Sequence, residues 1–450
     1  MKNAKGFSEV NRFVAGLDLA GAADHYVCGP RKDDGTHDIE HFGTTTDELA
    51  RMLAWLKARK VVSVAMESTG VYWIPVYDML ESGGIRPVLA DTRQVHMIPG
   101  RKSDVQDCQW LQRLHSCGLI RGAFRPPERF NAIRTVIREK ANVSAMRTQA
   151  VQALQKSMDA MNIRLHHAVS DITGLTGMAI LGAIVSGERD PHALAALRDK
   201  RCKKTEDEIA AELTGNWREE HLFTLGQAYR TLVFLDERME EFDDEIRAMY
   251  AKLAAEADKP DPPPPEREPK PKDRVDAEAK RNLAKLLGGF DPTSMDGIDY
   301  ALAAAIVAET GPDLSMFENE AHFISYVGLK PSLGKSAGKN VRTGRKAKNT
   351  CRIGQYFRQA AFTLTRSSCA LGARFRCVRS RSCPTTAIKD VARELAKRYY
   401  RGVRYGQAYV DIGEEAYLLR RREQMVRNMK RNIAKLGISP EELGFLRDVG

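Results

Sequence analysis

The sequence contains no apolar run that approaches the roughly 20 residues that a bilayer-spanning helix requires. Its first residues also lack the apolar core of a secretory signal peptide. The eight cysteines include no pair in the CxxC spacing, and their other spacings match no common zinc site. We therefore expect a cytoplasmic chain with reduced thiols and no membrane partner.

Acidic residues are in the minority. The 450 residues include 59 Asp and Glu against 70 Lys and Arg, which gives a net charge of +11. Such an excess indicates a polyanionic partner, usually a nucleic acid. It is concentrated in residues 335–352, which hold seven Lys or Arg and no acid, and again in residues 420–431. A solvated basic surface is the alternative interpretation.

The length predicts two or three domains. Residues 129–258 are rich in charged helix formers and predict a helical or coiled-coil region. Residues 259–275 contain seven prolines, all within residues 260–273, and predict a stiff linker. Residues 276–450 predict a mostly α-helical C-terminal domain.

Residues 10–128 alternate short apolar runs with amphipathic stretches, which predicts an α/β domain with a mixed sheet. The first three predicted strands are expected to form a meander. The predicted strands are Phe13–Leu19, His25–Gly29, Ile39–Phe42, Val61–Met66 and Ile85–Ala90, and the predicted helices are Thr46–Lys57, Tyr72–Leu80 and Ser103–His115.

Within residues 225–257, apolar residues alternate spacings of three and four, which is a heptad pattern. This pattern favours either a spacer or dimerisation arm, or an ordinary helix that faces the core of its own chain. The residues of the pattern are Leu232, Leu235, Met239, Phe242, Ile246, Met249 and Leu253.

Four acids occupy positions that suit a metal site. Asp18 and Glu67 each lie at the end of a predicted buried strand, and Asp104 and Asp107 open a predicted helix, three residues apart on one face. Clustered carboxylates repel one another, so a cluster normally implies bound cations, and hard oxygen ligands favour Mg²⁺ or Mn²⁺. Each acid taken alone is more often a turn or capping residue.

The segments GLDLA, MESTGVYW and ADTRQVHMIPGRKSDVQD resemble the N-terminal domain of the DEDD transposases of insertion sequences, which are related to the pilin-gene invertases. The resemblance implies a RuvC-like fold of the RNase H type over residues 12–128. It makes the four acids the catalytic metal ligands. It also places two basic residues beside the Asp pair, where we expect them to bind nucleic acid: Arg101 and Lys102.

A Gly- and Lys-rich loop surrounds Ser336. A loop serine is usually a turn former, but nearby cations can bind a scissile phosphate and glycines allow close backbone approach. The lead-in Gly328-Leu329-Lys330-Pro331 resembles the C-terminal domain of the same transposases, in which a serine is the nucleophile. That resemblance implies Ser336 as the nucleophile, with Ser332 as the alternative. The expected nucleic-acid contacts are Lys335, Gly338, Lys339, Arg342, Arg345 and Lys348.

Residues 294–311 contain a turn at Gly297 followed by a helix of small residues. They favour either a helix-hairpin-helix that contacts the DNA backbone or a tightly packed core helix.

These features together predict a nucleoid-associated transposase or site-specific recombinase that cuts and rejoins double-stranded DNA. The resemblance implies a transient phosphoserine, assistance from the metal-binding carboxylates and a guide RNA encoded by the element. A homo-oligomer, either a dimer or a tetramer, is expected, because the four acids are far from Ser336 in the sequence. The alternatives are a metal-dependent nuclease that resembles Holliday-junction resolvases and forms no covalent intermediate, and a nucleic-acid-binding protein without catalysis.

Overall fold

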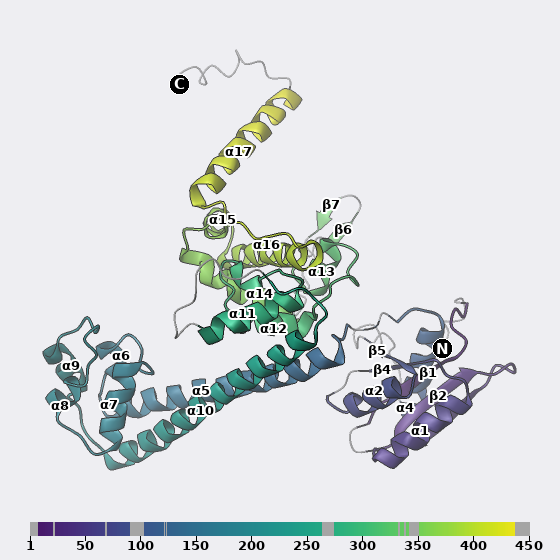
Figure 1. Cartoon of the computed structure of the whole chain (residues 1–450), viewed down its shortest axis with the longest axis horizontal. Helices are drawn as coiled ribbons and strands as arrows, with labels where there is room; N and C mark the ends of the chain where they lie inside the picture. The colour runs from purple at the N-terminus through teal and green to yellow at the C-terminus, as the bar shows by residue number, and fades with distance from the viewer. Residues whose placement is uncertain are drawn as a thin grey trace. The chain divides into compact units, whose positions relative to one another are not determined.

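The computed structural model divides the chain into two compact units, Met1–Arg125 and Pro126–Gly450, each of which is described by itself (Figure 1). The residues that the structure describes are 8–20, 23–67, 70–90, 103–120, 122, 124–262, 274–331, 334–336, 339–341 and 351–436.

A five-stranded mixed sheet forms the centre of the first unit, in the order β3-β2-β1-β4-β5. Strand β4 pairs in parallel with β1 on one side and with β5 on the other, whereas β1, β2 and β3 form the predicted antiparallel meander. Residues 14–17 are all buried, as expected for a strand that is covered on both faces. The strands are β1 (Val14–Asp18), β2 (His25–Arg31), β3 (His37–Phe42), β4 (Ser63–Glu67) and β5 (Arg86–Ala90).

Three of the helices in this unit match the predicted ones. Helix α1 (Thr46–Ala58) begins at Thr45, whose side chain accepts a hydrogen bond from the backbone N–H of Glu48. Helices α2 (Trp73–Ser82) and α4 (Asp104–Ser116) follow β4 and β5 along the chain. The predicted RuvC-like α/β class is therefore correct for this unit.

The second unit contains a long helical hairpin made of α5 (Glu128–Ala160) and α10 (Glu219–Glu256), which lie side by side in Figure 1. Ion pairs between Lys140 and Asp243 and between Arg147 and Asp236 join the two helices. The heptad residues of α10 are buried or half-buried within the chain. The predicted seam therefore packs inside its own chain, which agrees with the core-facing interpretation.

A small helical subdomain connects the far ends of the hairpin. It has its own hydrophobic core, to which α5 contributes Leu154 and Met158 and α10 contributes Leu225 and Leu232. Its helices are α6 (Leu165–Ala168), α7 (Leu175–Val185), α8 (Pro191–Ala195) and α9 (Glu206–Leu213).

The remainder of the second unit is mostly helical, as predicted. Residues 263–273 of the expected proline-rich linker lie outside the described residues. The elements that follow are α11 (Arg274–Leu286), η2 (Pro292–Ser294), α12 (Tyr300–Thr310), α13 (Glu320–Tyr326), β6 (Gly334–Ser336), β7 (Lys339–Val341), α14 (Arg352–Thr363), η3 (Leu364–Arg366), α15 (Ala370–Arg379), α16 (Pro384–Tyr405) and α17 (Glu414–Leu436).

Helix α12 is the centre of this helical domain, because nine of its eleven residues are buried. The Tyr250 hydroxyl of α10 donates a hydrogen bond to the carbonyl oxygen of Ala304, which joins the hairpin to α12. Gly297 has a φ of +77°, and a Cβ there would lie 2.7 Å from the carbonyl oxygen of Ala360. The turn before α12 therefore packs against α14, which agrees with the core-helix interpretation of residues 294–311.

Candidate functional site

Two of the four predicted acids end neighbouring parallel strands. Asp18 is the last residue of β1, and Glu67 is the last residue of β4. The register places Leu17 beside Met66, so the two acids follow at the same level of the sheet. The carboxyl edge of a parallel sheet is where α/β domains commonly form their sites. Both side chains are half-buried at this edge.

Helix α4 brings the other two acids to the same place. Ser103 caps its first turn by accepting a hydrogen bond from the backbone N–H of Gln106, which fixes the start of the helix beside Asp104 and Asp107. The helix lies directly on β1: a Cβ on Gly16 would be 2.2 Å from the carbonyl oxygen of Cys108. Only glycine permits this approach. Because Cys108 follows Asp107, the contact at Gly16 sets the distance of the Asp pair from Asp18.

The other three acids affect the ionisation of Asp18. Burial, followed by repulsion from Asp107, Asp104 and Glu67, raises the pKa of Asp18 from 3.8 to about 6. A backbone hydrogen bond from Leu19 opposes the rise only in part. Two separate elements, α4 and β4, therefore place like charges near the Asp18 carboxylate.

The far end of α4 is anchored to β4. The Nε2 atom of His115 lies 2.9 Å from the hydroxyl oxygen of Ser63, and that hydroxyl donates a hydrogen bond to the carbonyl oxygen of Arg86. Burial, together with the charge of Arg86, lowers the pKa of His115 to about 4. The neutral imidazole is therefore part of the core that positions α4, and sequence reasoning did not single it out.

The donor set suits a hard divalent cation, because all four groups are carboxylates and a cation would relieve their repulsion. As the side chains stand, however, no three His, Cys, Asp or Glu residues in the described part of the chain are arranged to hold a metal ion. Asp104 is exposed and Asp107 is half-buried, so both lie where a rotamer change can move them.

Exposed apolar side chains lie next to this acidic edge, and the sequence prediction did not include them. Val71, Tyr72 and Ile74 follow Glu67 and are exposed at the start of α2. Behind them, the Arg125 guanidinium stacks 4.0 Å from the centre of the Tyr77 ring. The MESTGVYW segment could have revealed them, since three large apolar residues rarely follow a strand-end acid on a solvated turn.

The predicted nucleophile lies in the second unit, in a short hairpin. Ser336 is the last residue of β6 and pairs with Lys339 of β7, with two residues between them. The chain segments before and after this hairpin pack against each other. A Cβ on Gly354 of α14 would lie 2.2 Å from the carbonyl oxygen of Val327. The structure thus places Ser336 at the end of a short strand that pairs with β7.

A partly buried ion pair joins α5 to α12. Glu309 of α12 accepts two hydrogen bonds of 2.9 Å from the guanidinium of Arg138, which belongs to α5. Burial and the nearby Cys351 and Glu309 raise the pKa of Tyr326, which ends α13. The pair therefore connects the long hairpin to α12.

The remaining predicted residues bind nucleic acid or are alternatives to Ser336 in the sequence prediction. Those that lie outside the described residues are Arg101, Lys102, Ser332, Gly338, Arg342, Arg345 and Lys348. For Lys335, Ser336 and Lys339 the structure describes the backbone alone.

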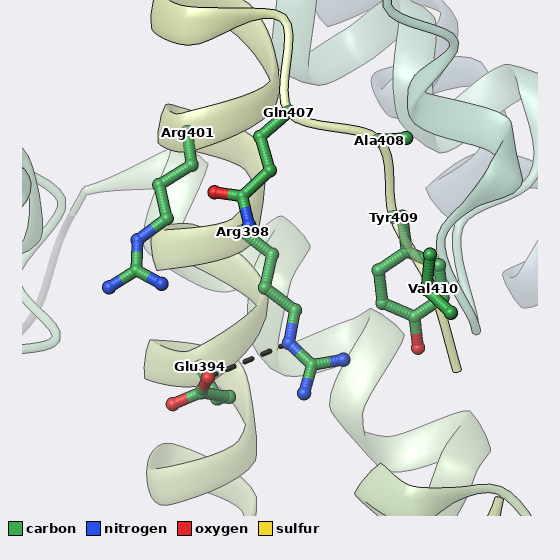
Figure 2. Close-up of a pocket in the computed structure, with 7 residues that line it drawn as sticks. All are labelled: Glu394, Arg398, Arg401, Gln407, Ala408, Tyr409 and Val410. Atoms are coloured by element: carbon green, nitrogen blue, oxygen red, sulfur yellow. Dashed lines mark ion pairs between the residues drawn. The ribbon is translucent and has the colours of Figure 1, made fainter. Parts of the chain in front are cut away.

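Figure 2 shows a pocket of about 290 Å³ at the C-terminal end of α16. Its cations already have partners: Arg398 lies 3.5 Å from Glu394, and Arg401 lies 2.7 Å from Glu320. None of the predicted site residues lines this pocket.

Comparison with known families matches both halves of the predicted site. Residues 15–163 match a family described as transposase, of the DEDD type in IS110 elements, and residues 293–376 match the transposase IS116/IS110/IS902 family. The first match contains the four acids and the second contains Ser336. No curated protein matches the chain. In the described residues, no helix is long and apolar enough to cross a membrane.

Proposed function

The chain belongs to the IS110 family of insertion-sequence transposases, which are enzymes that act on DNA, and on that premise we propose that it cuts and rejoins double-stranded DNA through a serine nucleophile. Ser336 is the proposed nucleophile, and Asp18, Glu67, Asp104 and Asp107 are the proposed metal-binding catalytic acids. The observation that carries the proposal is the placement of the four acids: Asp18 and Glu67 end neighbouring parallel strands, and α4 packs on β1 with Asp104 and Asp107 in its first turn.

In the proposed reaction the Ser336 oxygen attacks the phosphorus of a DNA phosphodiester. A serine–phosphate bond forms, the bond from phosphorus to a deoxyribose oxygen breaks, and that oxygen takes up a proton. Attack by a hydroxyl of another DNA end reverses these changes, rejoins the DNA and frees the serine. When bound, Mg²⁺ or Mn²⁺ would stabilise negative charge on the attacking and leaving oxygens. The four acids would hold those ions at the edge of the sheet.

The basic loop has the composition expected of a phosphate-binding segment. Residues 335–352 carry seven Lys or Arg and no acid. These cations would bind the DNA backbone on both sides of the scissile bond, without reading its sequence. We therefore propose that target choice comes from elsewhere, namely from a non-coding guide RNA encoded by the element.

We also propose a dimer or tetramer in which the acids of one copy serve the serine of another. The four acids and Ser336 belong to different compact units, which supports such a shared site. The rival proposal is a metal-dependent nuclease similar to Holliday-junction resolvases, for which the acidic cluster alone would suffice.

The test combines purified protein, Mg²⁺, DNA that carries the element's ends and RNA transcribed from its flanks. A denaturing gel would reveal a covalent protein–DNA adduct. We expect wild type and Ser332→Ala to form the adduct, whereas Ser336→Ala and Asp104→Asn do not. If Ser336→Ala cleaved DNA as well as wild type and no adduct formed, the nuclease proposal would replace this one.

A further inference from the structure

Helix α17 carries an apolar face that remains exposed among the residues that the structure describes. Figure 1 shows the helix leading away from α15, which its first turns contact, and Arg376 of α15 pairs with Glu414 there at 2.6 Å. Beyond Tyr417 almost every described residue is exposed. Five large apolar side chains along the helix are 41–59% exposed: Leu418, Leu419, Met425, Val426 and Met429.

The apolar residues follow a heptad pattern. Leu419, Val426 and Ile433 are seven residues apart, and Met429 lies three residues after Val426, so these four residues form one stripe. The residues of the same pattern in α10 are buried or half-buried where that helix packs against α5. In α17 the equivalent stripe has no partner helix among the described residues.

We propose that this stripe is the contact surface for a second copy of the same chain, with the two α17 helices antiparallel. A stripe of period 3.5 is the pattern that fits another helix, through knobs-into-holes packing. In an antiparallel pair, the central layers place Val426 of one copy against Met429 of the other. The β-branched side chain of Val426 and the unbranched side chain of Met429 then interleave across the two-fold axis.

The charges along α17 favour this occupant over a nucleic acid. The helix has seven Lys or Arg and three Glu, but apart from Arg422 the basic residues lie off the stripe and remain in solvent in the proposed pair. Of the positions that flank the stripe, two are charged, Glu423 and Lys430. An antiparallel arrangement places Glu423 of one copy near Lys430 of the other, twice by symmetry, whereas a parallel arrangement leaves both opposite apolar residues.

The first experiment compares self-association of the full chain by sedimentation over a range of concentrations, without DNA or RNA. The seam variant is Val426→Glu with Met429→Glu, and the matched control is Gln424→Glu with Asn428→Glu. Both change the charge of the same exposed helix equally. We expect the seam variant to weaken association at least about tenfold, because it would bury unpaired charge, and the control to resemble wild type.

A charge exchange tests the orientation of the helices. Glu423→Lys should weaken association, and Glu423→Lys combined with Lys430→Glu should restore it. Association that is equally strong in wild type and in the seam variant would overturn the proposal. So would a seam variant that changes only the binding of RNA or DNA, because the stripe would then serve a nucleic acid. Because neither result requires transposition, this test can fail or succeed independently of the proposed reaction.

Discussion

Replacing Asp18 by asparagine should stabilise the first unit, although it removes one of the four proposed catalytic acids. Burial and the three neighbouring acids raise the pKa of Asp18 from 3.8 to about 6. Each pKa unit corresponds to about 1.4 kcal/mol, so the charged form costs the fold roughly 3 kcal/mol before screening by solvent. Because the carboxylate is only half-buried, screening reduces the expected gain to about 1–2 kcal/mol at pH 7.5.

The sign of the pH dependence follows from proton linkage. A group whose pKa is raised by folding gives its full stability below its unfolded pKa and loses it as the pH rises through the folded value. For Asp18 the loss falls between pH 3.8 and about pH 6. Asp18→Asn should therefore raise the unfolding temperature at pH 7.5 and have little effect near pH 4.

The assay is thermal unfolding of the full chain in EDTA at these two pH values, with Glu81→Gln as a control that removes an exposed carboxylate from α2. Added Mg²⁺ should stabilise wild type and have much less effect on Asp18→Asn, since ligands stabilise only the state that binds them. A variant less stable than wild type at pH 7.5 in EDTA would refute the idea that the four acids repel one another.

Three further changes test how the site is built. Gly16→Ala should lower stability by about 1–3 kcal/mol and abolish the DNA adduct, because its Cβ would displace α4; unfolding and adduct assays would both detect this. His115, whose pKa is lowered to about 4, should give stability that is full above pH 6.5 and declines as the pH falls toward 4, and His115→Gln should flatten that decline in urea titrations. Glu309→Gln leaves Arg138 without its anionic partner and should cost about 1–2 kcal/mol in thermal unfolding, because the Arg138 side chain is partly exposed; an unchanged unfolding temperature would show that the pair is dispensable.

The strands of the first unit could be predicted from the sequence because each buried strand is a short apolar run that ends in a turn. That pattern also placed Asp18 and Glu67 at strand ends. The distance between Asp18 and Asp107 could not be predicted in this way. It depends on Gly16 meeting a backbone carbonyl about 90 residues later, and such a contact leaves no local signature.

The heptad pattern of α10 shows a second kind of feature that the sequence alone could not predict, namely the partner of a packing surface. Leu232 and Ile246 have the spacing of a coiled-coil seam, and knobs-into-holes packing is the same whether the facing helix belongs to the same chain or to another. Only the path of the chain through the connecting subdomain shows that α5 is the facing helix. The sequence therefore identified the surface but not its partner.

The length of the α5–α10 hairpin sets how far the helical subdomain lies from the rest of the second unit. Helix α5 has 33 residues and is therefore about 50 Å long at 1.5 Å per residue. The first family match ends at residue 163 and the second begins at residue 293, so the subdomain at the end of the hairpin lies outside both. Seven residues added to each helix would move that subdomain outward by about 10 Å and keep its facing direction, whereas three or four would turn it away. Insertions of whole heptads are thus the ones that can lengthen the hairpin without turning the subdomain.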